Sequence, residues 1–297
     1  MDILENCALC PKMCGVNRKN GELGFCGASD EVKIARCDLH FWEEPCISGK
    51  NGSGTVFFSH CNLRCVYCQN YKISHNALGK TLSVKELAKS FLMLQKKGAN
   101  NINLVTPTHF VPQIIEAVKI AKKDGLTLPI LYNSSGYERI ETLKMLEGII
   151  DIYLPDMKYF DDKYAVKYSG APNYFEIAAK AIDEMFLQVG KCTFDENGII
   201  KKGVIVRHLM LPNLIFDSKK IIDYLYSTYK DDIFISIMNQ YTPIKSQLLS
   251  HPELNKKIGD KYYHTLIDYA ADLGIKNAYI QEGETAKESF IPEFSGE

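Results

Sequence analysis

The chain has 297 residues, 46% of them hydrophobic and 24% charged, a composition that excludes collagen, a coiled coil and wholesale disorder and allows a sizeable core. Lys and Arg number 35 against 36 Asp and Glu, so the net charge of −1 offers no basic footprint for nucleic acid and no polybasic patch for a membrane. No apolar run approaches the ~18 residues of a membrane span, and the acidic first residues do not resemble a signal peptide, so we expect a cytoplasmic protein.

Residues 1–48 are predicted to form a Cys-rich, metal-binding segment with little apolar periodicity. Nine of the ten cysteines lie in the first 68 residues, and in a reducing compartment clustered thiols favour metal ligation over disulfides. Four cysteines of this segment are separated by two, three and eleven residues: Cys7, Cys10, Cys14 and Cys26. Four thiolates suit a closed zinc site and a second iron–sulfur cluster equally well, so both remain open. Cys37 or Cys46 could replace Cys26 as the fourth ligand, whereas Cys192 is expected to be a small hydrophobe.

The segment that follows, HFWEEPCISG, is predicted to be a solvated turn. In this interpretation Trp42 is an aromatic anchor, and Glu43 and Glu44 face water. The alternative is that the segment folds over the mouth of a barrel and contacts substrate or the N-terminal metal.

Residues 49–297 show strands and helices in alternation. Apolar strands are predicted at 55–58, 102–105, 128–132, 149–154, 203–211 and 232–238, with one more short strand at 277–280. Amphipathic helices are predicted at 83–98, 111–125, 138–148, 173–190, 218–229 and 260–274. This rhythm indicates a parallel sheet flanked by helices, either an open doubly wound sheet or a full or partial barrel. In both, the site lies at the carboxyl ends of the strands.

Three cysteines, Cys61-x3-Cys65-x2-Cys68, directly follow the first of these strands. Three thiolates within eight residues can ligate three irons of a cubane cluster and leave the fourth iron open to a small molecule. Residue type alone also permits a zinc knuckle that borrows a fourth ligand. A catalytic centre keeps one position open, and the missing fourth cysteine favours that interpretation.

This spacing, with Tyr67 before the third cysteine, resembles the radical S-adenosylmethionine (SAM) superfamily. The stretches FFSHCNLRCVYCQN, CALCPKMCGVNR, GELGFCG and HFWEEPCISG are similar to glycyl-radical-enzyme activases, in particular the branch of pyruvate formate-lyase activating enzyme homologues. The resemblance implies an α/β fold, a partial (β/α)6 TIM-type barrel over residues 49–297, with the Cys-rich segment 1–48 as a small N-terminal extension.

The resemblance also implies cofactors and the residues that hold them. Cys61, Cys65 and Cys68 would ligate a catalytic 4Fe–4S cluster that binds SAM. The implied cofactor-binding residues are Tyr67, Thr106, Thr108, Asn133, Ser135, Asp156, Lys158 and Arg207.

These assignments rest on matches of unequal strength. Residues 106–110 (TPTHF) take the place of the family's Gly-Gly-Glu motif but depart from it completely. Residues 133–136 are similar to an Asp-Thr-Asn-Gly loop, although a plain turn explains them equally well. Residues 156–158 are similar to an Asp-x-Lys motif, in which Lys158 would pair with the SAM carboxylate and Asp156 would help to hold a monovalent cation. A surface ion pair at residues 156–158, and a structural salt bridge at Arg207, are the alternatives.

The implied activity is reductive cleavage of SAM to methionine and a 5′-deoxyadenosyl radical, which abstracts hydrogen from a substrate. In the activase branch the substrate is a glycine of a glycyl radical enzyme. The implied partners are therefore such a protein or a small molecule, and a flavodoxin- or ferredoxin-type electron donor. A radical SAM enzyme acting on another peptide, a nucleoside or a small molecule, and a non-catalytic iron–sulfur or zinc module, are the alternatives.

Overall fold

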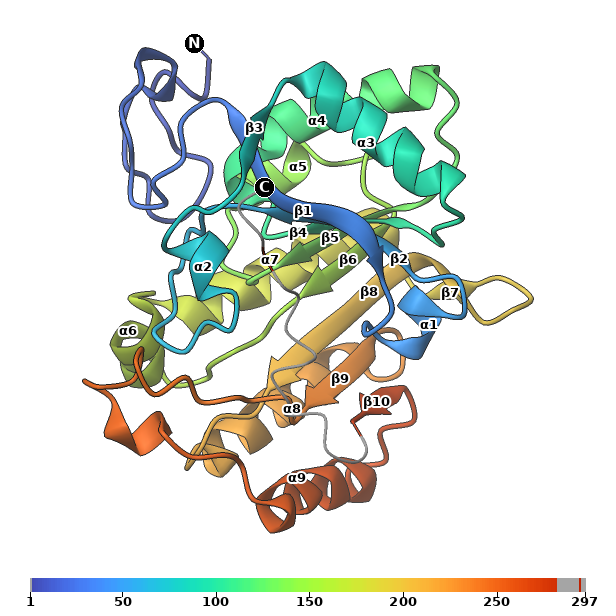
Figure 1. Ribbon diagram of the computed structural model, residues 1–297. Helices are drawn as coiled ribbons and strands as arrows, with labels where there is room; N and C mark the ends of the chain where they lie inside the picture. Colours follow the sequence, from blue (N-terminus) through green and yellow to red (C-terminus); the bar gives the residue numbers. More distant parts are fainter. Residues whose placement is uncertain (1, 282–293, 295–297) are drawn as a thin grey trace.

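The computed structural model describes residues 2–281 and residue 294. Its ten-stranded sheet has the order β10-β9-β8-β6-β5-β4-β2-β1-β3, with β7 attached to β8. Seven strands run parallel: β2 (Ser53–Phe58), β4 (Ile102–Val105), β5 (Ile130–Ser134), β6 (Ile152–Pro155), β8 (Ile200–Leu209), β9 (Phe234–Met238) and β10 (Ala278–Ile280). The sheet curves without closing (Figure 1), so the predicted partial barrel is confirmed.

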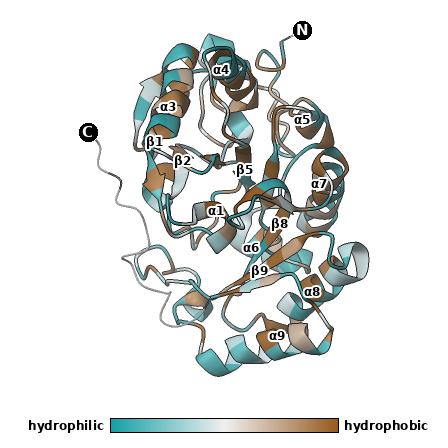
Figure 2. Cartoon of the chain, turned by 90° about the vertical axis from the view of Figure 1, so that its right-hand side faces the viewer, coloured by the Kyte–Doolittle hydropathy of each residue, from teal (hydrophilic) through white to brown (hydrophobic). Residues whose placement is uncertain are grey.

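Amphipathic helices pack on the outer face of the sheet, as their spacing predicted. The longest are α3 (Val84–Lys96), α4 (Val111–Lys123), α7 (Tyr174–Val189), α8 (Ile215–Tyr229) and α9 (Asp260–Asp272). In Figure 2 the strands are largely hydrophobic, and hydrophilic residues lie on the outward side of α4 and α9. The helix α3 begins at a capping box in which Ser83 and Glu86 bond each other's backbone N–H, and it buries Leu87, Phe91 and Leu94. Among the described residues, no helix is long and apolar enough to cross a membrane.

Two antiparallel strands, β1 (Val32–His40) and β3 (Lys80–Leu82), extend the sheet beyond β2. The sequence showed little apolar periodicity in residues 1–48 and no strand was predicted there, whereas residues 32–40 form β1. Only Val32 and Ile34 of β1 are buried, because β1 lies close to the edge of the sheet and its apolar alternation is correspondingly weak. The Cys-rich segment therefore runs directly into the barrel sheet.

The shorter elements connect this framework. They are η1 (Arg18–Asn20), α1 (Pro45–Ser48), α2 (Tyr71–Ser74), η2 (Thr108–Phe110), α5 (Ile140–Lys144), α6 (Asp162–Ser169), β7 (Thr193–Phe194) and η3 (Pro252–Leu254). The turn α1 follows β1 and fills the inside of the barrel near the amino ends of the strands. There Cys46 and Ile47 pack against the inward-facing Leu131 and Ile205, so α1 forms the floor of the barrel.

The first 30 residues dock against the barrel through polar contacts to their backbone. Arg18 is fully buried and donates to the carbonyl oxygens of Ser29 and, at 2.7 Å, of His109. Thr142 donates to the carbonyl of Leu9 at 2.8 Å, and Arg139 reaches the same stretch. Figure 1 shows these loops, in dark blue, at the same end of the sheet as α2 and α6, opposite the end where α1 and β7 lie. The N-terminal cysteines are therefore at the end of the barrel that carries the cysteine loop.

Candidate functional site

A cavity of about 320 Å³ occupies the inside of the barrel. It extends from the loop that carries Cys61, Cys65 and Cys68 to the floor built by residues 43–45, and the strand ends of β4, β5, β6, β8 and β9 line its side. In a parallel barrel the carboxyl ends of the strands meet at one face, so side chains far apart in the sequence converge there. Of the predicted cofactor-binding residues, seven line this cavity: Tyr67, Thr106, Asn133, Ser135, Asp156, Lys158 and Arg207.

Hydrogen-bond donors point at all three sulfurs of the cysteine loop. The N–H of Leu63 donates to Cys61 Sγ at 3.4 Å, Ser74 Oγ to Cys68 Sγ at 3.3 Å, and Ser169 Oγ to Cys65 Sγ at 2.9 Å. Such donors suit thiolate acceptors.

Burial raises the pKa of Cys61 to about 12 and that of Cys68 to about 11, with Cys65 as an electrostatic neighbour of both. A metal centre favours the thiolate form and removes this penalty, so the loop fits a cluster that binds thiolates.

No three His, Cys, Asp or Glu side chains within residues 2–281 and 294 converge at the distances of a single metal ion. A cubane cluster attaches each cysteine to a different iron. Separated sulfurs in one loop are therefore compatible with a cluster.

A chain of hydroxyl groups leads from the cavity wall to one of these sulfurs. The hydroxyl groups of Tyr67 and Tyr159 lie 2.7 Å apart, and Tyr159 is 2.8 Å from Ser169, which donates to Cys65. Tyr67, Tyr159 and Ser169 are all buried. The sequence did not point to Ser169, because a single serine at the end of α6 carries no motif.

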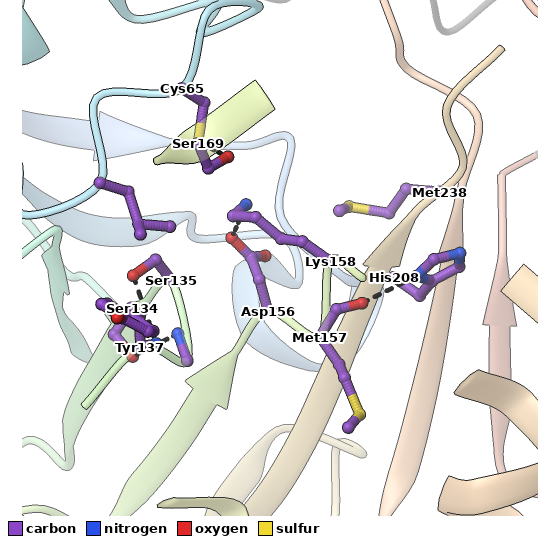
Figure 3. A network of polar contacts seen from close by, with 12 residues as sticks. Cys65, Ser134, Ser135, Tyr137, Asp156, Met157, Lys158, Ser169, His208 and Met238 are labelled. Carbon is purple, nitrogen blue, oxygen red and sulfur yellow. Dashed lines mark hydrogen bonds and ion pairs between the residues drawn. The ribbon is translucent and has the colours of Figure 1, made fainter. Parts of the chain in front are cut away.

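Asp156 and Lys158 follow β6 and form an ion pair at the cavity, shown in Figure 3 with Cys65 and Ser169 nearby. Burial opposes the positive charge of Lys158, but Asp156 and then Cys65 hold its pKa above the usual value. Lys158 is thus a permanent cation whose side chain is 14% exposed. The pair lies half-buried in the cavity wall, with the side chains of Lys158 and Asp156 14% and 22% exposed, and is not the exposed surface ion pair given as the alternative. Asp156 already has Lys158 as its cationic partner.

The loop after β5 is held against the loop after β6 by one tyrosine from α7. The hydroxyl of Tyr174 is 2.8 Å from the carbonyl of Ser135 and 3.0 Å from that of Asp156, and it accepts from the N–H of Lys158 at 3.0 Å. Gly136 has φ +73, and a Cβ there would lie 2.2 Å from the Asp156 carbonyl, so only glycine allows this approach. The structure therefore fixes Asn133, Ser135 and Lys158 relative to one another.

The loop after β4 divides between the cavity and the outer side of the sheet. Thr106 lines the cavity with a strained φ of +58. Thr108 does not line it, since its hydroxyl donates at 2.7 Å to the buried Glu138. Burial raises the pKa of Glu138 to about 7. His109 is buried, its pKa is lowered by burial to about 3, and its Nε2 lies 2.7 Å from the Ser59 carbonyl. His109 thus supports the cysteine loop from behind.

Arg207 lines the cavity but is occupied by an ion-pair network with the floor. Its guanidinium donates to Glu44 Oε1 at 2.8 Å and also pairs with Glu43. Burial opposes the ionisation of Glu44, but Arg207 overrides it and keeps the pKa of that carboxyl below normal. The predicted solvated turn was therefore wrong for Glu43 and Glu44, whose side chains are 7% and 5% exposed, whereas Trp42 is 62% exposed. The structural salt bridge, one of two readings of Arg207, describes these contacts.

The geometry defines a class: an α/β partial barrel with a three-cysteine centre and a buried lysine in one cavity. The family model of the radical SAM superfamily matches residues 55–194. An uncharacterized protein from Methanocaldococcus jannaschii is 30% identical over 267 residues, covering 86% of this chain and 72% of the relative. A pyruvate formate-lyase-activating enzyme from Clostridium pasteurianum is 27% identical over 191 residues, covering 62% of this chain and 72% of that enzyme. The chain belongs to the radical SAM superfamily.

Solved structures share the fold at low sequence identity. SuiB from Streptococcus suis bound to S-adenosylmethionine has a TM-score of 0.52 at 15% identity, with 80% of this chain and 51% of SuiB covered. HydG, a maturase of the FeFe-hydrogenase, has a TM-score of 0.51 at 15% identity, with 78% of this chain and 52% of HydG covered. The chain therefore spans about half the length of these two structures. Membership of the superfamily implies a 4Fe–4S cluster and SAM as cofactors.

Proposed function

We propose that this radical SAM enzyme abstracts a hydrogen atom from a backbone glycine of a partner protein, in the manner of a glycyl-radical-enzyme activase. The observation that carries the proposal is that three cysteine thiols and a buried lysine cation share one cavity at the carboxyl ends of the strands. The relationship to a pyruvate formate-lyase-activating enzyme supports the activase class.

The cysteine loop would hold the cluster through Cys61, Cys65 and Cys68. When bound, the reduced cluster would supply the one electron that cleaves SAM, and the carbon-centred radical so formed would remove hydrogen from the substrate. The residues of this chain position the cofactor and exclude water. Leu63, Ser74 and Ser169 stabilise the negative charge on the sulfurs through the hydrogen bonds that they donate.

Lys158 would receive the carboxylate of SAM. Its charge is enclosed, so an incoming carboxylate meets a cation with little competing water. Asp156 keeps the lysine protonated before the ligand arrives. Asn133, Ser135 and Thr106 present amide, hydroxyl and backbone groups to the same cavity, where an amine and ribose hydroxyls need partners.

The shape of the cavity supports a protein or peptide as the substrate. Residues from opposite sides of the open sheet contribute to its lining, with Trp42 after β1, the strand next to one edge, and Ile280 in β10 at the other edge. Both side chains are large, apolar and exposed, at 62% and 44%. Exposed apolar residues beside a cavity are typical of surfaces that bind another chain.

SAM cleavage tests the enzymatic part of the proposal. Protein reconstituted anaerobically with iron and sulfide is given SAM and dithionite, and 5′-deoxyadenosine is measured. We expect turnover by the wild type and by Cys192→Ala, and none by Cys65→Ala. Cleavage by Cys65→Ala at the wild-type rate would refute the cysteine assignment.

Electron paramagnetic resonance tests the activase part. The reconstituted enzyme is mixed with a glycyl radical enzyme from the same organism, and we expect a glycyl radical signal that depends on SAM. If SAM is cleaved but every candidate partner stays silent, the radical SAM assignment stands and the activase assignment fails.

A further inference from the structure

Cys7, Cys10, Cys14 and Cys26 lie together in one small, turn-rich part of the N-terminal segment. They are separate from the cysteine loop that carries Cys61, Cys65 and Cys68, which is called the catalytic loop below. Two backbone hydrogen bonds, each 3.0 Å long, close a loop at Cys7. The N–H of Cys7 donates to the carbonyl of Val16, and the N–H of Gly15 donates to the carbonyl of Cys7. Cys10 has Cys26 and Cys14 as electrostatic neighbours, and the neighbours of Cys26 include Cys7 and Cys14. All four are free thiols.

Backbone amides are aimed at three of these sulfurs. The N–H of Phe25 donates to Cys14 Sγ at 3.2 Å. The amides of Lys12 and Ala28, each two residues after a cysteine, bond the sulfurs of Cys10 and Cys26.

The catalytic loop uses the same arrangement. There the amides of Leu63 and Asn70 serve Cys61 and Cys68 at the same offset of two residues. Donors preorganised around sulfur stabilise thiolates, so the N-terminal segment has the local geometry of a loop that ligates metal.

Residues next to the N-terminal cysteines contact residues next to the catalytic loop or its serine donor at two places. Lys12 donates from Nζ to the Gly170 carbonyl at 2.5 Å, and the adjacent Ser169 donates to Cys65 Sγ at 2.9 Å. Gly27, which follows Cys26, is in contact with His60, since a Cβ on Gly27 would lie 3.3 Å from His60 Nδ1. His60 directly precedes Cys61. The two sets of cysteines are therefore joined by short paths through packed protein.

The cysteines that the sequence offered as substitutes for Cys26 lie elsewhere. Cys37 is in β1 beside Ser90 and Lys97 of the α3 region. Cys46 is buried in the floor of the barrel, where Tyr279 is its hydrogen-bond partner. Cys26 is therefore the fourth member of the N-terminal set.

We propose that Cys7, Cys10, Cys14 and Cys26 bind a second iron–sulfur cluster that relays electrons to the cluster of the catalytic loop. Four thiolates occupy all four irons of a cubane cluster and leave no position for substrate, so such a centre carries electrons and performs no bond chemistry. One electron enters from an external one-electron donor of the flavodoxin or ferredoxin type, reduces the second cluster, and then passes to the first. The donor is oxidised by one electron, and no bond or proton changes. The relay rests on the proposed function, whereas the presence of the second cluster does not.

Metal and sulfide analysis of the reconstituted full chain tests the second cluster. We expect about eight iron and eight sulfide per wild-type chain, and about four of each both in Cys14→Ser and in a variant with Cys61, Cys65 and Cys68 all replaced by Ala. Cys14 is exposed, so its substitution leaves the packing intact. Cys37→Ser and Cys192→Ser are the matched controls and keep the wild-type content. Circular dichroism establishes that each variant is folded.

Two results would overturn this assignment. One is four iron together with one zinc in the wild type, which would show a structural zinc site. The other is four iron with no second metal, which would show four free thiols.

The relay has its own readout, the rate at which the reduced signal of the catalytic cluster appears in electron paramagnetic resonance. In Cys14→Ser, we expect this rate to be at least tenfold lower with a flavodoxin-type donor than with dithionite. In the wild type, the rates with the two reductants should not differ in this way. An unchanged ratio would refute the relay and leave the iron count standing. Failure of the wild type to cleave SAM, with both clusters present, would refute the proposed function instead.

Discussion

Lys158 carries a buried positive charge beside a carboxylate and two cysteines of the catalytic loop. If its role is to receive the carboxylate of SAM, removing the charge weakens binding by about 1.5–3 kcal/mol, the usual contribution of a hydrogen bond to a charged group. We expect Lys158→Met to raise the dissociation constant of SAM by about tenfold to a hundredfold in isothermal titration calorimetry.

Lys163, in the first turn of α6, offers a matched control. It is exposed and pairs only locally with Asp161, so Lys163→Met is expected to bind SAM like the wild type. Equal binding by both variants and the wild type would contradict a role for Lys158 in SAM recognition.

Ser169 donates a hydrogen bond to Cys65. Without this donor, negative charge on the sulfur is less stabilised, and adding an electron to the cluster becomes less favourable. We expect Ser169→Ala to shift the reduction potential of the catalytic cluster to a more negative value, measured by redox titration with electron paramagnetic resonance. Ser90→Ala removes a half-buried hydroxyl of α3 that bonds the Glu86 carbonyl and neighbours Cys37, which is not one of the three cysteines of this loop, and should leave the potential unchanged. A potential unchanged in Ser169→Ala would mean that Cys65 does not carry the cluster.

At the scale of elements, the floor turn α1 is held to β8 by the ion pair between Glu44 and Arg207. The two residues are 163 positions apart in the sequence, and the side chains of Glu44 and Arg207 are only 5% and 12% exposed. Removing one partner of a buried pair costs about 3–5 kcal/mol, because it leaves the other charge without full compensation. Glu44→Ala should lower the free energy of unfolding in urea by roughly this amount. The loss is smaller to the extent that Glu43 still compensates the charge of Arg207.

Glu141 provides the comparison for this prediction. It forms an exposed pair with Arg139, so Glu141→Ala should change the free energy of unfolding by about 1 kcal/mol or less. If Glu44→Ala is no more destabilising than Glu141→Ala, the floor does not depend on this ion pair.

Another connection between elements makes stability depend on pH. Glu138 bonds Thr108 of η2 and Tyr132 of β5, and burial raises its pKa from 4.5 to about 7. The folded state therefore holds a proton that the unfolded chain releases at lower pH. This contribution to stability is fully present below pH 4.5 and is lost as the pH rises through about 7.

We expect Glu138→Gln to abolish that part of the pH dependence, because the amide stays neutral. In urea unfolding at pH 5 and pH 8, the loss of stability between the two pH values should be smaller in the variant by up to about 3 kcal/mol. The same loss in variant and wild type would show that Glu138 is ionised in the folded protein.

For the whole molecule, the decisive contact is the docking of the N-terminal segment onto the barrel. Arg18 is 1% exposed and bonds carbonyl groups of both parts. Replacing it by Met leaves those carbonyls unsatisfied, so the segment should open more often than the barrel unfolds. We expect faster limited proteolysis of Arg18→Met between residues 19 and 24, with the barrel fragment intact.

Lys19 is the neighbouring control, since it is exposed and pairs with Asp2. Lys19→Met should be cleaved there no faster than the wild type by a protease that does not select lysine. If Arg18→Met resists proteolysis as the wild type does, other contacts such as that of Thr142 with Leu9 hold the segment.

Much of the fold and of the site was accessible from the sequence because the relevant signals are local. Strands and helices repeat with periods of two and 3.6 residues, and Ser83 and Glu86 marked the start of α3 within one residue. Cys61, Cys65 and Cys68 lie within eight positions of one another, so a single loop presents them together. The strand rhythm predicted which loops meet at the carboxyl ends, and that placed Asn133 and Lys158 in one cavity.

Only the tertiary structure decided the contacts between positions far apart along the chain. Ser169 reaches Cys65 across 104 positions, and Arg207 is taken up by Glu44 rather than left free for a ligand. Thr108 turns to Glu138 on the outer side of the sheet, a direction that the composition of its loop does not specify. Such pairings depend on the curvature of the barrel and on the face of the sheet from which each loop emerges. A polar side chain therefore acquires its partner only when the whole sheet is in place.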